Sequence, residues 1–136
     1  MRLFFCLMVG FLSFSGCKKK IESIKEDLLI KLIVDGQWAV NKYTKGATDE
    51  TYQFSAYSFQ FKKDFTVDAI RNGAVDNTGT WSGDVNTRII TSNFTNANPT
   101  LMLLNGNWYV TDSGMDYVET TQTINNEACF LRLLKK

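Results

Sequence analysis

The sequence predicts an all-β protein: an eight-stranded antiparallel up-and-down barrel preceded by one short N-terminal helix. From residue 36 onward, segments with alternating apolar and polar residues are separated by short turn signals such as Asn72-Gly73. Alternation indicates strands with one buried face, and short connections favour antiparallel neighbours. Eight strands can close into a barrel that leaves no exposed edge and can enclose one small ligand. A sandwich of the same strands is the alternative fold.

The first segment, residues 1–16, has the order of a secretory signal. Arg2 is basic, Leu3–Phe14 is almost wholly apolar, and the small residues Ser15 and Gly16 follow. The apolar run is about a dozen residues, whereas a membrane-spanning helix needs about 20. We therefore expect this segment to be removed rather than retained as a membrane helix.

The sequence Leu-Ser-Phe-Ser-Gly-Cys at residues 12–17 resembles the lipobox of bacterial lipoproteins, although Phe14 stands where the family usually has Leu. The resemblance implies that the Cys17 sulfur carries a diacylglycerol and that the chain is cut just before it, with palmitate among the expected acyl chains. Two or more acyl chains hold a protein stably on a membrane. An ordinary signal peptide cut elsewhere is the alternative interpretation.

The same resemblance predicts a location in the cell envelope. Lys18, rather than Asp, follows the cysteine, which by analogy with lipoprotein sorting favours the outer membrane, and the basic run favours its periplasmic face. Lys18–Lys20 either dock on anionic headgroups or form a solvated linker. The predicted organisation is a signal peptide at 1–16, a lipid anchor, tether and helix at 17–34, and the barrel domain at 35–136.

The predicted helix spans Ile21–Val34. Ile21, Ile24, Leu28 and Leu32 recur at helical spacing, and Gly36 is a plausible stop. An apolar stripe of this width must be covered, because exposed apolar patches are unfavourable. We expect the helix to close one end of the barrel, and a partner protein from the envelope is the alternative cover.

The aromatic pattern of the second strand breaks once, which predicts a β-bulge near Ser55–Ala56. Leu101–Leu104 fits either a short helical turn or the start of a strand. The eight predicted strands span Trp38–Thr44, Tyr52–Lys62, Phe65–Arg71, Thr78–Gly83, Thr87–Ser92, Asn107–Thr111, Met115–Gln122 and Glu127–Leu134.

The tripeptide Gly36-Gln37-Trp38 at the start of the first strand resembles the Gly-x-Trp motif of the lipocalins, in particular the short lipocalin-like domains of Bacteroidetes lipoproteins, over residues 34–136. The resemblance implies that Trp38 closes the barrel floor and that Arg132, in the last strand, lies across its ring. Such a cation–π contact contributes about 0.5–2 kcal/mol. The alternative is that Trp38 is an ordinary core residue and Arg132 is solvated.

The composition argues against catalysis. The chain has no histidine, which removes Ser-His and Cys-His nucleophile systems and most zinc sites. We find neither a phosphate-binding loop nor a dinucleotide fingerprint, and we expect no metal, no cofactor and no enzyme activity. Fifteen basic residues balance 14 acidic ones, so a nucleic-acid partner is not expected. Cys129 is expected to be a buried apolar residue.

The enrichment in aromatic residues suggests two functions. A barrel lined by aromatic groups with a few polar ones suits a small apolar ligand. A barrel filled by its own side chains would instead suit a structural or protein-interaction role at the envelope. The candidate ligand-binding residues are Tyr57, Phe59, Gln60, Phe61, Trp81, Trp108 and Tyr117.

Overall fold

The computed structural model describes residues 26–136. The predicted signal peptide, the lipidation site Cys17 and the first part of the predicted helix, residues 21–25, lie outside the described residues. Within the described part, a helix spans residues 26–34 and is followed by strands along most of the chain. No helix in this part is both long enough and apolar enough to cross a membrane.

The strands form one closed antiparallel barrel, as the sequence predicts. Neighbours along the chain pair in the order β2-β1-β3-β4-β5-β6-β7-β8-β9, and β1 also pairs with β9 from Trp38↔Lys135 to Lys45↔Cys129. The two-residue β2 only extends the end of β1, so eight strands form the wall. The strands are β1 (Trp38–Lys45), β2 (Thr48–Asp49), β3 (Tyr57–Phe61), β4 (Thr66–Arg71), β5 (Ala74–Asp84), β6 (Ile89–Asn93), β7 (Gly106–Ser113), β8 (Tyr117–Ile124) and β9 (Glu127–Lys135).

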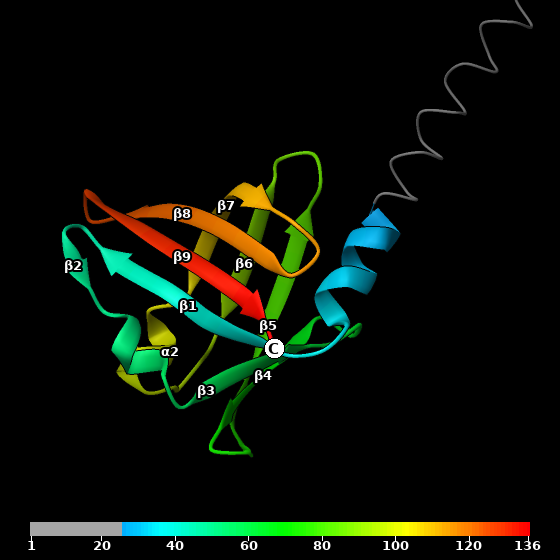
Figure 1. Ribbon diagram of the computed structural model, residues 1–136, viewed down its shortest axis with the longest axis horizontal. Helices are drawn as coiled ribbons and strands as arrows, with labels where there is room; N and C mark the ends of the chain where they lie inside the picture. The colour runs from blue at the N-terminus through cyan, green and yellow to red at the C-terminus, as the bar shows by residue number, and fades with distance from the viewer. Residues whose placement is uncertain (1–25) are drawn as a thin grey trace, which may run out of the picture.

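The helix at 26–34 lies at one end of the barrel, which we call the helix end (Figure 1). The same end carries the β3–β4, β5–β6 and β7–β8 turns, because each of these strands runs toward the helix before the chain reverses. Ile33 is 5% exposed, and Leu29, Ile30 and Val34 pack against the core. The prediction that the apolar stripe faces the barrel is therefore confirmed for Leu29 and Ile33, which widen the stripe, whereas Leu28 remains 60% exposed. Ile21 and Ile24 lie outside the described residues.

The predicted strand at Tyr52–Lys62 with a bulge near Ser55–Ala56 is wrong in its first half. Thr51–Phe54 forms a 3-10 helix, η1, and β3 begins only at Tyr57. The aromatic residues change from even to odd positions where this 3-10 helix ends. Phe54, its last residue, is part of the core with 2% exposure. A 3-10 turn and a β-bulge both change which positions, odd or even, face the core. The spacing of apolar residues alone therefore does not tell one from the other.

Other local signals have clear outcomes. Asn72 and Gly73 both have positive φ, 50° and 83°, which is the primed turn that the Asn-Gly pair predicts. The helical alternative for Leu101–Leu104 is correct in kind, since Pro99–Met102 forms α2, capped by the Asn98 side chain. The strand predicted to begin at Thr78 begins earlier, at Ala74, because the tight turn lets pairing continue to the end of the hairpin.

Candidate ligand-binding site

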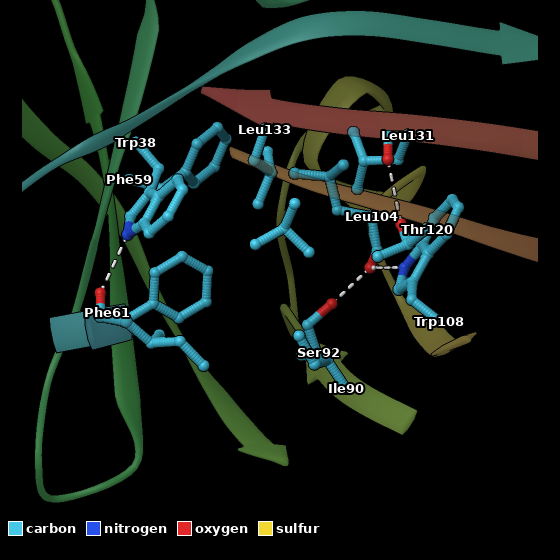
Figure 2. Close-up of a pocket in the computed structure, with 12 residues that line it drawn as sticks. Trp38, Phe59, Phe61, Ile90, Ser92, Leu104, Trp108, Thr120, Leu131 and Leu133 are labelled. Carbon is cyan, nitrogen blue, oxygen red and sulfur yellow. Dashed lines mark hydrogen bonds between the residues drawn. The ribbon is translucent and has the colours of Figure 1, made fainter. Parts of the chain in front are cut away.

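The barrel interior near the helix end holds a small cavity of about 60 Å³. Figure 2 shows aromatic and aliphatic side chains converging on it, and the strands that supply them are β1, β3, β6, β7, β8 and β9. Among the described residues that line it, none carries an ionisable side chain, so the wall of the cavity is uncharged. The lining residues are Ile33, Trp38, Phe59, Phe61, Ile90, Ser92, Leu104, Trp108, Val118, Thr120, Leu131 and Leu133.

The few polar groups in this lining are already hydrogen-bonded to main-chain carbonyls (Figure 2). Trp108 Nε1 donates to Leu104 O at 2.9 Å, and Ser92 Oγ donates to the same oxygen. Thr120 Oγ1 donates to Leu131 O at 3.1 Å. A polar ligand would have to displace these bonds, and each buried group left unpaired would cost about 1–3 kcal/mol. The cavity is therefore suited to an apolar guest.

A second hollow, of about 200 Å³, lies directly beneath the helix. Its walls come from Leu29 and Leu32 of the helix and from the β5–β6 and β7–β8 turns, with Asp84 and Arg88 among the turn residues. The two hollows share four lining residues, which makes them adjacent chambers of one apolar interior. The shared residues are Ile33, Trp38, Ile90 and Val118.

Three side chains of the barrel fasten the end of the helix over these chambers. The last carbonyls of a helix have no intrahelical partner and must be satisfied otherwise. Trp38 Nε1 donates to Ile33 O at 2.9 Å, Gln60 Nε2 to Val34 O at 3.1 Å, and Lys135 Nζ to Leu32 O at 3.1 Å. The donors come from three neighbouring strands, β9, β1 and β3. The β1–β9 pairing that closes the barrel therefore also helps to position the helix.

Lys135, not Arg132, lies over the Trp38 ring. The Lys135 ammonium is 5.2 Å from the centre of the indole, and the register places Trp38 opposite Lys135. Arg132 pairs with Lys42, three residues earlier on β9. Its side chain bonds Glu119 at 3.1 Å and lies 5.0 Å from the centre of the Tyr117 ring. The predicted Trp38–Arg132 contact is therefore replaced by a Trp38–Lys135 contact, although Trp38 itself is 1% exposed at the barrel floor.

Gly36 holds the connection between the helix and β1. Its φ of +75° lies in the left-handed region, where residues with a Cβ are strained. The Lys135 side chain approaches to 3.9 Å of the place where a Cβ would stand. Gly36 thus reverses the chain after the helix and leaves room for the lysine that caps it.

Of the candidate ligand-binding residues, Phe59, Phe61 and Trp108 line the inner cavity. Trp81 is buried behind the lining, 5.5 Å from the Phe61 ring, and donates to Lys62 O. The other three, Tyr57, Gln60 and Tyr117, point elsewhere.

The three polar candidates have structural partners instead of a place in the cavity. Gln60 caps the helix, as described above. Tyr57 donates to Asp76 at 2.9 Å toward the opposite end of the barrel. Tyr117 donates to Asp112 at 3.2 Å on the outer wall, and this hydrogen bond raises the pKa of the Tyr117 phenol. The polar groups of Gln60, Tyr57 and Tyr117 thus each have a hydrogen-bond partner outside the apolar interior.

Several lining residues were not among the sequence candidates. Val118 and Thr120 on β8, and Leu131 and Leu133 on β9, alternate into the cavity. Their two-residue spacing was visible in the sequence, but aromatic residues drew the prediction toward other positions. Ile33 and Leu104 lie on the helix and in the loop after α2, and strand alternation does not reach such positions.

The shifted ionisable groups lie outside the cavity. Lys62 Nζ contacts Asp68 at 2.7 Å, and this bond, with a further one from Thr78, lowers the pKa of the Asp68 carboxyl. Burial raises the pKa of Tyr43, beside Cys129 in the core. Cys129 is 1% exposed, as expected for a packed thiol. Along residues 26–136, no cluster of three or more acidic, cysteine or histidine side chains could hold a metal ion.

A larger but polar groove, of about 310 Å³, lies outside the barrel wall beside β3. Its lining includes Ser58, which donates to Gln37 at 2.9 Å, and the turn residues Asn72 and Gly73. Polar side chains and turn residues make up much of its lining, so it does not suit an apolar guest. We therefore assign the candidate site to the two apolar chambers.

Replacing Lys135 by methionine should loosen the helix while sparing the barrel. Methionine keeps the apolar stem but loses the hydrogen bond to Leu32 O, and one such bond contributes about 1 kcal/mol. Hydrogen exchange of the helix amides should therefore accelerate by about fivefold relative to the β-strand amides. Arg132→Met is the matched control, because Arg132 makes its contacts on the outer wall. Equal acceleration in both variants would contradict the assignment.

The fold and the site define a class: a closed eight-stranded β-barrel with an apolar interior capped by an N-terminal helix. The crystal structure of a DUF4847 family protein from Bacteroides vulgatus ATCC 8482 is similar, with a TM-score of 0.58 and 14% sequence identity, over 79% of this chain and 97% of that chain. At this identity the likeness shows the fold. No family model matches the sequence, and no curated protein matches it.

Proposed function

We propose that this protein is a lipid-anchored, lipocalin-like envelope protein that binds a small apolar ligand at the helix end of its barrel. The observation that carries the proposal is the pair of adjacent apolar chambers under the helix. The polar groups of the inner lining already form hydrogen bonds to main-chain carbonyls. A ligand would therefore be recognised by its shape and by burial of its apolar surface. The proposed role is binding, without catalysis and without a cofactor.

The volumes restrict the ligand. Sites for drug-sized molecules usually measure about 300–1,000 Å³, whereas the chamber beneath the helix measures about 200 Å³ and the inner one about 60 Å³. A short acyl chain or a compact hydrophobic molecule is the class that such a space suits. A larger ligand would require the helix to move outward, against three side-chain hydrogen bonds at its last turn, the Lys135–Asp35 ion pair and apolar packing.

The anchor part of the proposal is supported by sequence alone. It rests on the lipobox-like residues 12–17, the predicted lipidation of Cys17 and the basic residues after it, with the periplasmic face of the outer membrane as the proposed location. Its test is the mass of the N-terminal peptide of protein purified from membranes. A diacylated cysteine at the first position supports the anchor, and an unmodified Cys17 overturns it.

Native mass spectrometry on protein purified gently from its own membranes tests ligand binding. We expect a co-purifying small molecule, and Ile90→Phe should reduce its occupancy because Ile90 lines both chambers. Overpacking costs about 1–3 kcal/mol, which corresponds to about a 5- to 150-fold loss of affinity. Val75→Phe, at a position 59% exposed, is the matched control. Equal occupancy in both variants would contradict this site.

A second role, as a structural or protein-interaction lipoprotein, is favoured by one observation. Aromatic side chains, with rings 5.3–6.4 Å apart in pairs such as Tyr43–Phe54 and Phe59–Phe94, already fill the centre of the barrel. On this hypothesis the protein purifies without ligand, and cross-linking from Leu28, which is 60% exposed, captures one envelope protein reproducibly. A bound ligand that Ile90→Phe displaces would argue against it.

A further inference from the structure

We propose that the helix end of the barrel is a membrane-docking face, which rests on the lipid surface and opens the apolar chambers toward it. This inference rests on the proposed function, because it takes the lipid anchor at Cys17 as given. The proposed occupant of the face is the phospholipid bilayer. The inference goes further than the anchor, since a tethered barrel could also stand away from the membrane on its linker.

The first argument is the length of chain between anchor and barrel. The described helix begins at residue 26, and Cys17 is nine residues earlier. Even fully extended, nine residues span at most about 30–32 Å. Residue 26, where the described helix begins, lies at the helix end of the barrel (Figure 1). The anchor therefore keeps the start of the helix within about 30–32 Å of the bilayer, and the opposite end of the barrel is tethered less closely.

The second argument is the set of apolar side chains that this end exposes. Met115, in the β7–β8 turn, is 81% exposed, and Leu28, on the helix, is 60% exposed. Each directly neighbours residues that line the larger chamber, namely Gly114 and Leu29. Large apolar side chains around an apolar opening are typical of membrane and ligand contact sites.

The third argument is the conformation of Phe65 in the β3–β4 turn. Its φ of 64° lies in the left-handed region, where a bulky residue is a genuine outlier. Glycine would suit this position better, yet the chain places an aromatic ring there, 46% exposed and 5.4 Å from the Trp81 ring. Strained backbone that presents a particular side chain is a reason to infer function. A partly exposed ring braced on a buried one is suited to the interface between lipid and water.

The opposite end also exposes apolar residues, including Tyr52 at 73% and Val75 at 59%. The helix that connects to the tether lies at the other end, and so do the turns that line the larger chamber. The proposal therefore predicts a difference between the two ends of the same molecule. That difference can be measured with one probe at each end.

The test uses the full processed protein, purified from membranes and reconstituted by its anchor into phosphatidylcholine–phosphatidylglycerol vesicles. A fluorescent maleimide is placed at Met115→Cys at the helix end or, as matched control, at Val75→Cys at the opposite hairpin. Both positions are exposed, and the native Cys129 is 1% exposed and should not react. Lipids carrying a nitroxide near the headgroup quench a fluorophore only when it is at the bilayer surface.

We expect strong quenching of the probe at position 115 and almost none at position 75. No quenching of either probe, or equal quenching of both, would overturn the docking face, and quenching of the probe at 75 alone would place the opposite end on the membrane. Wild-type protein treated with the same maleimide separates failure of the anchor from failure of docking. A lipidated Cys17 has no free thiol, so label that peptide mapping locates at Cys17 of the wild-type protein would mean that the proposed anchor is wrong, whereas label at the other free thiol, Cys129, would not.

Discussion

Trp38→Ala is expected to lower the free energy of unfolding by about 3–5 kcal/mol, the range for removal of a large buried aromatic residue. The side chain is 1% exposed and lines both apolar chambers. Its N–H holds Ile33 O, and its ring receives the Lys135 ammonium. One substitution therefore removes core volume, a helix-capping bond and a cation–π contact together. Urea unfolding followed by circular dichroism measures the change.

Trp38→Phe separates these contributions. Phenylalanine keeps most of the apolar volume but cannot donate to Ile33 O, so that a buried carbonyl loses a partner at a cost of about 1–3 kcal/mol. We expect an intermediate loss of stability, together with faster exchange of the helix amides. A loss of less than about 1 kcal/mol for Trp38→Ala would be close to the effect of an ordinary surface substitution. That result would contradict the assignment of Trp38 to the barrel floor.

Gly79→Ala is the second substitution with a large expected effect. A Cβ at this position would lie 2.5 Å from Asn93 O and 2.7 Å from Cδ1 of Phe94. The backbone oxygen belongs to the neighbouring strand β6 and cannot move without disturbing the ladder, in which Thr80 pairs with Asn93. Overpacking usually costs about 1–3 kcal/mol, and we expect the upper part of this range, measured by urea unfolding.

Gly83→Ala provides the matched control in the same strand. There the nearest atom to the new Cβ is Cζ3 of Trp81 at 3.7 Å, which is an ordinary van der Waals contact. Its effect should stay within about 1 kcal/mol, because replacing glycine in a strand also reduces the entropy of the unfolded chain. A similar decrease in the free energy of unfolding in the two variants would contradict this explanation. It would mean that the close approach of β5 and β6 is not the reason for glycine at position 79.

The fold was predictable because its signals are local and repeated. Alternating segments and primed turns such as Asn72-Gly73 determine antiparallel neighbours, and eight such strands favour closure. The 3-10 helix at Thr51–Phe54 was not predictable from periodicity. Only the three-dimensional context, in which Thr51 Oγ1 accepts from Tyr43 N at 2.9 Å, shows why the chain turns there before starting β3.

The candidate site was only partly predictable, because register across the seam is a long-range property. Of the seven candidate residues, Phe59, Phe61 and Trp108 line the inner cavity. The basic residue opposite Trp38 depends on the β1–β9 register, which includes an irregularity between Val40 and Lys42, and it is Lys135 rather than Arg132. Residue type alone also did not show that Gln60 would cap the helix instead of facing a ligand.

The β1–β9 seam has a consequence for how the protein is made. The other wall pairings join strands that follow one another, whereas Trp38 pairs with Lys135 almost a full chain length away. Contacts of such high separation form late, because loop-closure entropy must be overcome first. During synthesis, β1 and β8 therefore expose unpaired edges until Glu127–Lys135 is made, and edges of this kind are prone to aggregation. The last strand to emerge protects the whole molecule against self-association.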